Sequence, residues 1–293
     1  MGVAAAMECL QEAKVDKPDA IVTGTAYGCL EDTAVFLSRM VEFKEELLTP
    51  TAFIQSTHNT IGAQIGLMLQ CNNYNNAFVH RGNSFESALL DAMMLINDDE
   101  AQNVLVGGID EITKESHAIL TRMGLYRRNE RSNLSLFQRN EKGTIAGEGA
   151  SFFLMTKDPS GADYAKLDGL TTFYKPAGIP AIEEHIKEFL SSHSIQPTDI
   201  DLVIMGRNGD KRFDGVFDKI EKGFTGTPSV NFKHLCGEYP TATGFAMWLA
   251  ANILRTNSIP DVLDVKPGKA IKRILVYNNY LGINHTLMLL SAC

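Results

Sequence analysis

The fold is decided by two stretches of the same form, Asp19-Ala20-Ile21-Val22-Thr23-Gly24 and Asp201-Leu202-Val203-Ile204-Met205-Gly206. Each begins with an aspartate, continues as an apolar run containing Ile and Val, and ends in glycine. A short continuous apolar run bounded in this way is typical of a strand covered on both faces. Each run also follows an amphipathic helical pattern, at residues 3–13 and 182–191. The chain is therefore predicted to repeat a helix–strand unit.

The similarity extends outward from both stretches. Each is followed by a strand, a glycine, a long apolar helix and a further buried strand. These segments are residues 77–80, Gly82, 85–96 and 104–108 in the first half, and residues 229–232, Gly237, 241–254 and 274–278 in the second. Strands alternating with helices indicate parallel sheets with helices on both faces. We predict an α/β fold of two pseudo-repeated halves, residues 1–160 and 161–293, that form one compact five-layer α/β/α/β/α sandwich.

The two predicted halves differ at their beginnings. The second half opens with a strand pattern at residues 165–174, whereas the first half opens directly with a helical pattern. A sheet that lacks an expected strand leaves backbone donors and acceptors unpaired. We therefore expect that this sequence is an N-terminally shortened version of a longer one.

Composition excludes several classes of protein. The 293 residues include 44% hydrophobic and 21% charged residues, and the net charge of -8 disfavours nucleic-acid binding. The five cysteines are odd in number and lack metal-ligand spacing, which is typical of reduced cytoplasmic thiols. The most apolar stretch, residues 244–251, is too short to span a bilayer, and no basic flank precedes the apolar N-terminus. We predict a cytoplasmic protein with no metal and no cofactor.

Four segments resemble motifs of the β-ketoacyl-acyl-carrier-protein synthases, members of the thiolase superfamily. Residues 21–28 resemble the early strand and glycine turn, residues 53–62 resemble Phe-Pro-x-Ser-x-x-Asn-x-x-Ala-Gly, residues 104–111 resemble Val-x-Ala-Gly-Gly-x-Glu, and residues 143–150 resemble Asp-Gly-x-x-x-Gly-Glu-Gly-Ala. The last match is the most specific, and the order is that of the family along nearly the whole chain. The resemblance implies a thiolase-like five-layer fold.

The resemblance also implies a particular chemistry. In this family a cysteine at the start of a buried helix is held as a thiolate and takes an acyl group from a carrier protein. Two histidines then stabilise the enolate that forms when a malonyl group loses carbon dioxide, and a lysine supports them. Such roles transfer to this chain only where its residues match.

The catalytic positions do not match. Aligned on the long helix, the cysteine position is Gly82, which has no side chain. No histidine follows the strand that ends at Gly206, and Arg207 lies at that position. At the second histidine position the chain has Glu238, although Lys233 matches the family lysine. A carboxylate beside a forming enolate would raise the barrier, so no catalytic residues are expected.

A non-catalytic synthase-like chain has a precedent within the family. The resemblance is to the chain-length-factor subunits of fatty-acid-like and polyketide (aryl-polyene-like) systems, which lack the cysteine and pair with an active synthase. The family pairs through the strand before the nucleophile turn, here about residues 76–80. A homodimer or a heterodimer with an active synthase is therefore expected, with no membrane or nucleic-acid partner. The candidate ligand is a phosphopantetheine-linked acyl group on an acyl carrier protein.

Other interpretations stay open at this point. The chain could instead be a 3-oxoacyl-acyl-carrier-protein synthase, or an acyltransferase or decarboxylase, with Cys236 or Ser84 as a non-standard nucleophile. Against this, Cys236 fits a buried thiol, and Ser84 fits a helix cap that accepts a backbone N–H. Lys233 could form a structural ion pair with Glu238. A purely structural dimer is a third hypothesis.

Basic residues could dock an acidic carrier protein, or could form a solvated loop with Glu130 and Glu141. They are Arg122, Arg127, Arg128, Arg131 and Arg139.

Overall fold

The computed structural model describes residues 1–46, 48–128, 132–138, 141–266 and 268–293. It divides into two compact units. The first comprises residues 1–123, 146–158 and 239–244, and the second comprises residues 124–145, 159–238 and 245–293. The change of unit after residue 158 lies next to the predicted boundary between the halves. Residues 124–145, which come from the predicted first half, belong to the second unit. Residues 239–244, which come from the predicted second half, belong to the first unit.

The first unit contains a four-stranded sheet with the order β2-β1-β3-β4. β1 is parallel to β2 and β3, and β4 is antiparallel to β3. The strands are β1 (Ala20–Gly24), β2 (Tyr74–Phe78), β3 (Asn103–Asp110) and β4 (Gly149–Thr156). β1 is buried along its whole length because apolar helices cover both of its faces.

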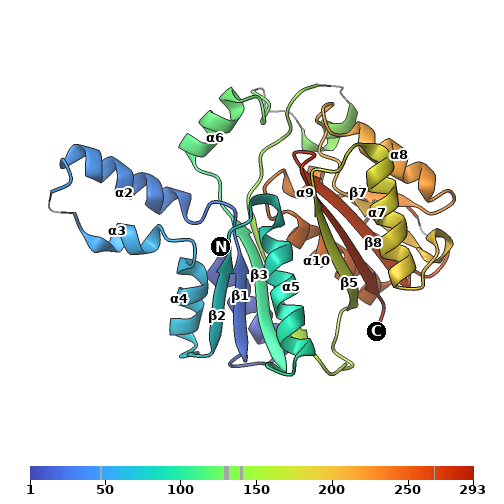
Figure 1. The fold of residues 1–293 in the computed structure, drawn as a ribbon, viewed down its shortest axis with the longest axis horizontal. Helices are drawn as coiled ribbons and strands as arrows, with labels where there is room; N and C mark the ends of the chain where they lie inside the picture. Colours follow the sequence, from blue (N-terminus) through green and yellow to red (C-terminus); the bar gives the residue numbers. More distant parts are fainter. Residues whose placement is uncertain (47, 129–131, 139–140, 267) are drawn as a thin grey trace. The chain divides into compact units, whose positions relative to one another are not determined.

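Three helices cover this sheet: α1 (Gly2–Ala13), α4 (Thr60–Met68) and α5 (Ser84–Asn97). α1 and α4 share one apolar cluster with the sheet, to which Leu10, Ile65 and Leu105 belong. α5 lies over β1 and β3 in Figure 1, and its Phe85 packs against Gly108. Since residues 105 and 108 of one strand point to opposite faces, α5 covers the other side of the sheet.

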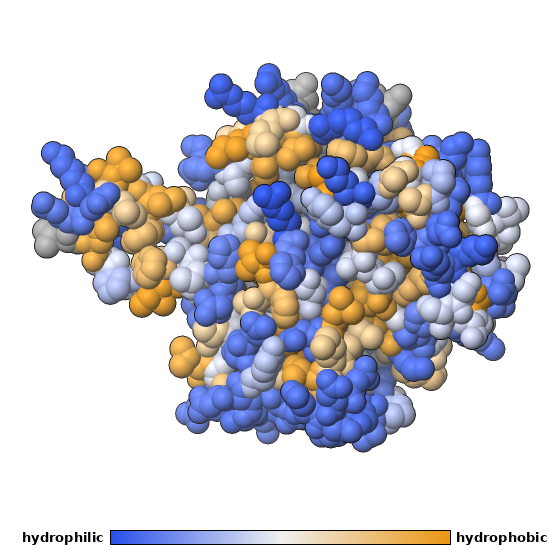
Figure 2. Space-filling view, viewed as in Figure 1, coloured by the Kyte–Doolittle hydropathy of each residue, from blue (hydrophilic) through white to orange (hydrophobic). Residues whose placement is uncertain are grey.

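A hairpin of helices extends away from the sheet of the first unit (Figure 1). It is formed by α2 (Leu30–Glu42) and α3 (Pro50–Gln55), which meet through the rings of Phe36 and Phe53 at 5.3 Å. None of the α2 residues is buried. Figure 2 shows apolar side chains gathered on this hairpin. The unit is completed by η1 (Arg81–Asn83) and α6 (Lys114–Arg122).

The second unit contains a five-stranded sheet with the order β5-β9-β8-β6-β7. β6 is parallel to β7 and β8, whereas β9 is antiparallel to β8 and β5. The strands are β5 (Lys166–Tyr174), β6 (Leu202–Met205), β7 (Ser229–Asn231), β8 (Arg273–Tyr280) and β9 (Asn284–Ser291). The helices are α7 (Ile179–Ser192), α8 (Gly215–Gly223), α9 (Lys233–Cys236) and α10 (Thr243–Thr256), with η2 (Asn133–Gln138), η3 (Pro197–Asp199) and η4 (Asp261–Leu263).

The predicted repeat is confirmed in the strand orders. β1, β2, β3 and β4 occupy the places that β6, β7, β8 and β9 occupy in the second sheet. The correspondence extends to Asp19 and Asp201, the aspartates that precede β1 and β6. Asp19 accepts the backbone N–H of Gln102 at 2.9 Å and of Asn103 at 3.1 Å. Asp201 accepts those of Lys272 at 2.9 Å and Arg273 at 3.0 Å. Each carboxylate thus fixes the start of the strand beside it.

The predicted asymmetry is also present, because β5 has no counterpart in the described part of the first sheet. One strand differs from its prediction: β2 covers residues 74–78 rather than 77–80. Its register with β1 runs from Tyr74 to Phe78. Asn75 and Asn76 gave no apolar signal because β2 is an exposed edge strand. Within the described residues, no helix is long and apolar enough to cross a membrane.

We predict that Asp19→Ala lowers the free energy of unfolding by about 1.5–3 kcal/mol, because it removes charge-assisted hydrogen bonds to two strand amides. Urea denaturation measures the change. Asp16→Ala is the matched control, because Asp16 is exposed nearby in the sequence. Equal stabilities of the two variants would show that the Asp19 carboxylate does not hold β3.

Candidate functional site

The turn that precedes α5 carries the expected nucleophile position, and that position has no reactive group. Gly82 is buried in the short helix η1. Ser84 is fully buried, and its hydroxyl donates to the carbonyl of Arg81 at 2.8 Å and accepts the backbone N–H of His80 at 2.9 Å. Ser84 therefore accepts a backbone N–H as predicted, but from the turn rather than from the helix. Its hydroxyl thus donates one hydrogen bond and accepts another within the turn.

The rings of His80 and His58, which could in principle act as bases for Ser84, bind elsewhere. The imidazole Nδ1 of His80 is 2.8 Å from the hydroxyl of Ser87, one turn further along α5. His58 lies beside Gly28 in a separate cavity of the same unit. Among the described residues, no imidazole ring is hydrogen-bonded to the Ser84 hydroxyl, so the pairing that would activate this serine is not formed.

A close approach of backbone fixes this turn. A Cβ built on Gly24, the last residue of β1, would lie 2.3 Å from the carbonyl oxygen of Ser84. Only glycine permits the end of β1 to contact the start of α5 at this distance. The glycine turn that resembles the family motif is therefore required by packing.

The second histidine position is occupied by a buried ion pair. The Lys233 side chain is fully buried and Glu238 is 3% exposed. The ammonium lies 2.9 and 2.8 Å from the two carboxylate oxygens of Glu238, and it also donates to the carbonyl of Asn279 at 3.1 Å. Asn208 donates its side-chain amide to the same carboxylate at 2.5 Å. The predicted pairing of Lys233 with Glu238 is confirmed.

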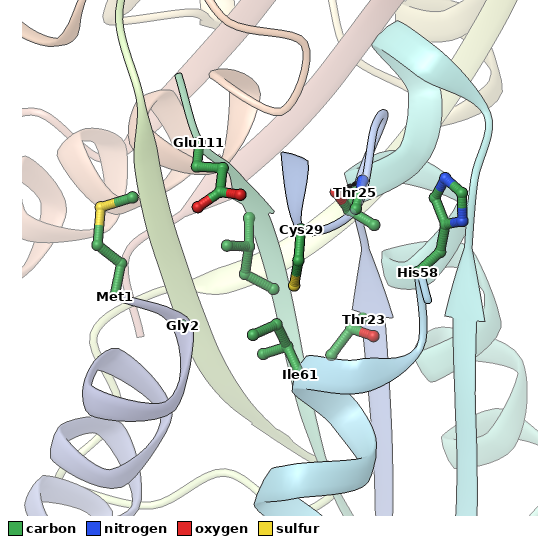
Figure 3. A pocket seen from close by; sticks show the side chains of 10 residues that line it. Met1, Gly2, Thr23, Thr25, Cys29, His58, Ile61 and Glu111 are labelled. Atoms are coloured by element: carbon green, nitrogen blue, oxygen red, sulfur yellow. Dashed lines mark hydrogen bonds between the residues drawn. The ribbon is translucent and has the colours of Figure 1, made fainter. Parts of the chain in front are cut away.

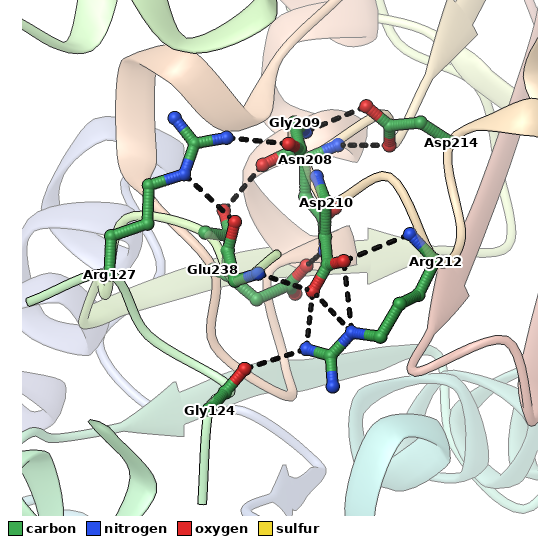
Figure 4. A network of polar contacts seen from close by, with 10 residues as sticks. Gly124, Arg127, Asn208, Gly209, Asp210, Arg212, Asp214 and Glu238 are labelled. Carbon is green, nitrogen blue, oxygen red and sulfur yellow. Dashed lines mark hydrogen bonds and ion pairs between the residues drawn. The ribbon is translucent and has the colours of Figure 1, made fainter. Parts of the chain in front are cut away.

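The loop after β6 is held by a network that adjoins this ion pair (Figure 4). Asp214 accepts the backbone N–H of Asn208 at 3.1 Å and of Gly209 at 2.9 Å. Asp210 accepts the N–H of Gly143 at 2.9 Å and pairs with Arg212. Burial raises the pKa of Asp210, but the Arg212 guanidinium and the backbone donors outweigh it and hold this pKa below its usual value. The loop where the first histidine was expected is thus rigidly bonded.

Two of the arginines that sequence analysis singled out belong to this region. Arg127 donates to the carbonyl of Gly143 at 2.9 Å and to that of Gly209 at 2.5 Å. Arg207, at the first histidine position, forms an ion pair with Asp218 on α8. Arg131 and Arg139 lie outside the described residues. Arg127 therefore acts inside the network, and Arg122 and Arg128 remain as the described candidates for docking a carrier protein.

Cys236 lies beside the ion pair but lacks the features of a nucleophile. Burial raises the pKa of its thiol to about 12, with Lys233 lowering it and Glu238 raising it by smaller amounts. The sulfur lies 3.3 Å from the carbonyl oxygen of Gly237. Burial also lowers the pKa of the neighbouring His234, whose ring packs edge-on against Phe137 at 5.3 Å. At neutral pH the thiol is protonated, so it cannot attack a thioester efficiently.

A cavity of about 70 Å³ lies at the carboxyl ends of β1 and β3 in the first unit (Figure 3). Its lining includes Cys29, which is among the residues that sequence analysis did not select. Burial raises the pKa of this thiol to about 11, with smaller contributions from Glu111 and Asp32. The lining residues are Met1, Gly2, Thr23, Thr25, Gly28, Cys29, His58, Ile61, Ile109 and Glu111. Sequence analysis could have selected these residues from their position just after predicted parallel strands, because ligands bind at the carboxyl ends of such strands.

Beside this cavity, Asp110 is a buried carboxyl group without a cationic partner in its hydrogen bonds. It accepts the N–H of Ala26 at 2.8 Å, the hydroxyl of Thr25 at 3.1 Å and the N–H of Thr241 at 3.1 Å. Burial nevertheless raises its pKa to about 6. No cluster of three metal-ligating side chains occurs among the residues that the structure describes.

Comparisons with known proteins agree with this geometry. Residues 1–125 match the sequence model of the family described as β-ketoacyl synthase, N-terminal domain. A β-ketoacyl synthase from Burkholderia phymatum has 15% identity and a TM-score of 0.78, covering 99% of this chain and 81% of its own. No curated protein matches the sequence.

Two further solved structures have the same fold. The ishigamide ketosynthase/chain length factor has 17% identity and a TM-score of 0.78, covering 99% of this chain and 81% of its own. The second is AntDE:AntF, a type II polyketide synthase acyl-carrier protein in complex with its ketosynthase bound to the hexaketide. It has 15% identity and a TM-score of 0.79, covering 99% of this chain and 83% of its own. The resemblance and the thiolase-like fold predicted from the sequence are confirmed.

We predict that Lys233→Met lowers the free energy of unfolding by about 3–5 kcal/mol, because Glu238 is then buried without its counter-ion. The double variant Lys233→Met/Glu238→Leu should recover most of this loss. Chemical denaturation measures both, and Lys222→Met, at an exposed lysine on α8, is the control with a change within about 0.5 kcal/mol. A double variant as unstable as the single one would contradict the charge-pair interpretation.

We predict a pH dependence of stability that arises from Asp110. Because its pKa is raised to about 6 in the folded state, its stabilising contribution is full below pH about 4 and is lost as the pH rises through about 6. In Asp110→Asn this loss is absent, so the variant gains up to about 3 kcal/mol relative to the parent between pH 4 and 7. Urea denaturation across this range measures it, with Asp16→Asn as control. Parallel curves for Asp110→Asn and the parent would refute the prediction.

Proposed function

We propose that this chain, whose fold is that of the β-ketoacyl synthases, is a non-catalytic subunit of the chain-length-factor type that pairs with an active synthase. The observation that carries the proposal is the buried ion pair of Lys233 and Glu238. It occupies the place where the family chemistry needs a neutral hydrogen-bond donor. The proposed setting is fatty-acid or polyketide (aryl-polyene-like) biosynthesis in the cytoplasm.

The hydrogen-bond donors of Lys233 support the proposal that this chain does not catalyse condensation. An ammonium has three N–H donors, and the three acceptors of Lys233 are both oxygens of Glu238 and the carbonyl of Asn279. No donor of Lys233 is left to stabilise a developing enolate. The Glu238 carboxylate, in turn, is an acceptor and would repel that negative charge. Condensation therefore lacks its electrostatic support as well as its nucleophile at Gly82.

The first unit has surfaces suited to a subunit partner. β2 is an edge strand whose residues 74 and 75 are exposed. Apolar side chains beside it are exposed on both neighbouring helices, namely Leu67 and Met68 on α4 and Met94 on α5. We propose that pairing through β2 places this chain beside an active synthase, and that Arg122 and Arg128 contribute to docking of the acyl carrier protein. The ligand of the pair would be a phosphopantetheine-linked acyl group.

We predict that the intact mass of the isolated protein is unchanged after incubation with malonyl and acyl thioesters of a phosphopantetheine carrier. The reason is that Gly82 offers no nucleophile, the Cys236 thiol is protonated and the Ser84 hydroxyl is bonded within its turn. A cysteine-containing synthase treated in parallel should gain one acyl group. A stable adduct on this chain would instead support the enzyme with a non-standard nucleophile, and Cys236→Ala and Ser84→Ala would locate it.

The partner is tested separately. The tagged chain should copurify at equal stoichiometry with a β-ketoacyl synthase that contains the active-site cysteine, and the pair should condense malonyl and acyl groups. Asn76→Lys, which places a charge on the edge strand, should weaken the pair. A protein that forms only homodimers, without turnover, would support the purely structural dimer and contradict the proposal.

A further inference from the structure

Helix α2 carries an apolar stripe that the described residues of the chain leave largely exposed. Its members follow one another at intervals of 4, 3 and 4 residues, and they are Leu30, Ala34, Leu37 and Val41. Because an α-helix turns by about 100° per residue, these intervals bring the four side chains to one face. Leu30 and Ala34 are partly exposed, and the exposed fractions of Leu37 and Val41 are 53% and 82%. This face is called the α2 stripe below.

The α2 stripe is not the face that packs within the hairpin. α2 meets α3 through the rings of Phe36 and Phe53, and Phe36 points about 100° away from Leu37 around the helix. Alternating intervals of three and four residues are those by which one helix packs along another. A helix as short as α2, with 13 residues, is marginal in water unless an apolar face is buried. The α2 stripe thus has the form of a seam for one further helix.

The strand that the internal repeat leaves open in the first sheet belongs elsewhere. β4 is the equivalent of β9, whose outer neighbour is β5, so an additional strand of this chain would lie beside β4. The hairpin instead leads into α4, which packs against β1 and against β2, the opposite edge strand of the sheet. Figure 1 shows the hairpin extending beyond α4. A strand added at β4 would therefore leave the α2 stripe uncovered.

The charges around the α2 stripe indicate the kind of partner. Two copies of α2 packed in parallel would bring Glu42 beside Glu42 of the other copy, and two antiparallel copies would bring it beside Glu31. Like charges placed together oppose association, whereas Lys or Arg from a different chain would be attracted. Residues 30–46 contain five acidic and two basic side chains, with a net charge of -3: Glu31, Asp32, Glu42, Glu45 and Glu46, and Arg39 and Lys44.

We propose that the α2 stripe binds a helix of a different polypeptide, with apolar residues at the same spacing and Lys or Arg residues beside them. The inference rests on the proposed function, in which this polypeptide is the paired synthase. It adds to the pairing through β2 a second contact that depends on charge. A second copy of this chain is disfavoured at the same place because its charges are acidic.

Hydrogen exchange tests the contact on the unmodified full-length protein, alone and in complex with the cysteine-containing synthase that copurifies with it. Amides of residues 30–42 should exchange quickly in the free protein, and pairing should slow them by about tenfold or more. Slow exchange of α2 in the free monomer would show that the chain covers its own stripe, and it would overturn the inference. Protection that rises with the concentration of the free protein would show a second copy and would also overturn it.

Two variants test the chemistry of the contact. Leu37→Asp should weaken the pair by about tenfold or more, because it places a charge in the apolar seam. Ile119→Asp is the control, since Ile119 is 59% exposed on α6. Glu42→Lys should also weaken the pair and reduce the effect of salt on its affinity, with Glu115→Lys on α6 as control. The affinity of each variant for the synthase is measured by titration calorimetry.

The outcomes separate this inference from the proposed function. If the chain pairs with the synthase but only residues 74–78 become protected, or if Leu37→Asp pairs as tightly as Ile119→Asp, the inference is wrong and the proposed function stands. If no synthase pairs with the chain, both are wrong. Protection of residues 30–42 on pairing, together with weakening by Leu37→Asp and Glu42→Lys alone, would support the inference.

Discussion

The structure depends on one constraint: one interior strand of each sheet, β1 or β6, is buried at every position, so every backbone group along it must find a partner within the sheet. A parallel neighbour on each side supplies the ladder bonds, and helices fill the two faces. The aspartates at positions 19 and 201 then bind the amides where the neighbouring strand begins. Register, strand order and helix placement follow from this requirement.

Within this scaffold, the positions that the family resemblance assigns to catalysis take part in structural bonding. A buried lysine is costly unless a carboxylate and further acceptors satisfy it. In this chain Glu238 and Asn279 supply those acceptors, so all three donors of Lys233 are satisfied by structural bonds. The neighbouring loop is fixed by Asp210 and Asp214 through backbone donors. The residues around this position thus stabilise one another, which supports the proposal of a subunit that binds rather than reacts.

The sequence predicted which positions differ from the catalytic residues of the family, but it did not indicate which bonds the residues at those positions form. Motif order placed Gly82 and Glu238 at catalytic positions, and the short separation of Lys233 from Glu238 suggested their pairing. The contributions of Asn208 and Asn279 could not be predicted, because they come from the loop after β6 and from β8, 30 and 46 residues away from the groups that they bind. The cavity at Cys29 and His58 was missed for the same reason: its lining comes from separate strand ends and loops.

The sequence by itself determined the repeated strand–helix units, the additional strand of the second half and the glycine at position 82, where the resemblance places the nucleophile. These features are local, since each depends on apolar periodicity or on the identity of a single side chain. Tertiary structure alone decided where β2 begins and that Arg127 binds two carbonyl groups. Strand pairing and the donors and acceptors that meet in a folded chain depend on long-range contacts, which no local pattern encodes.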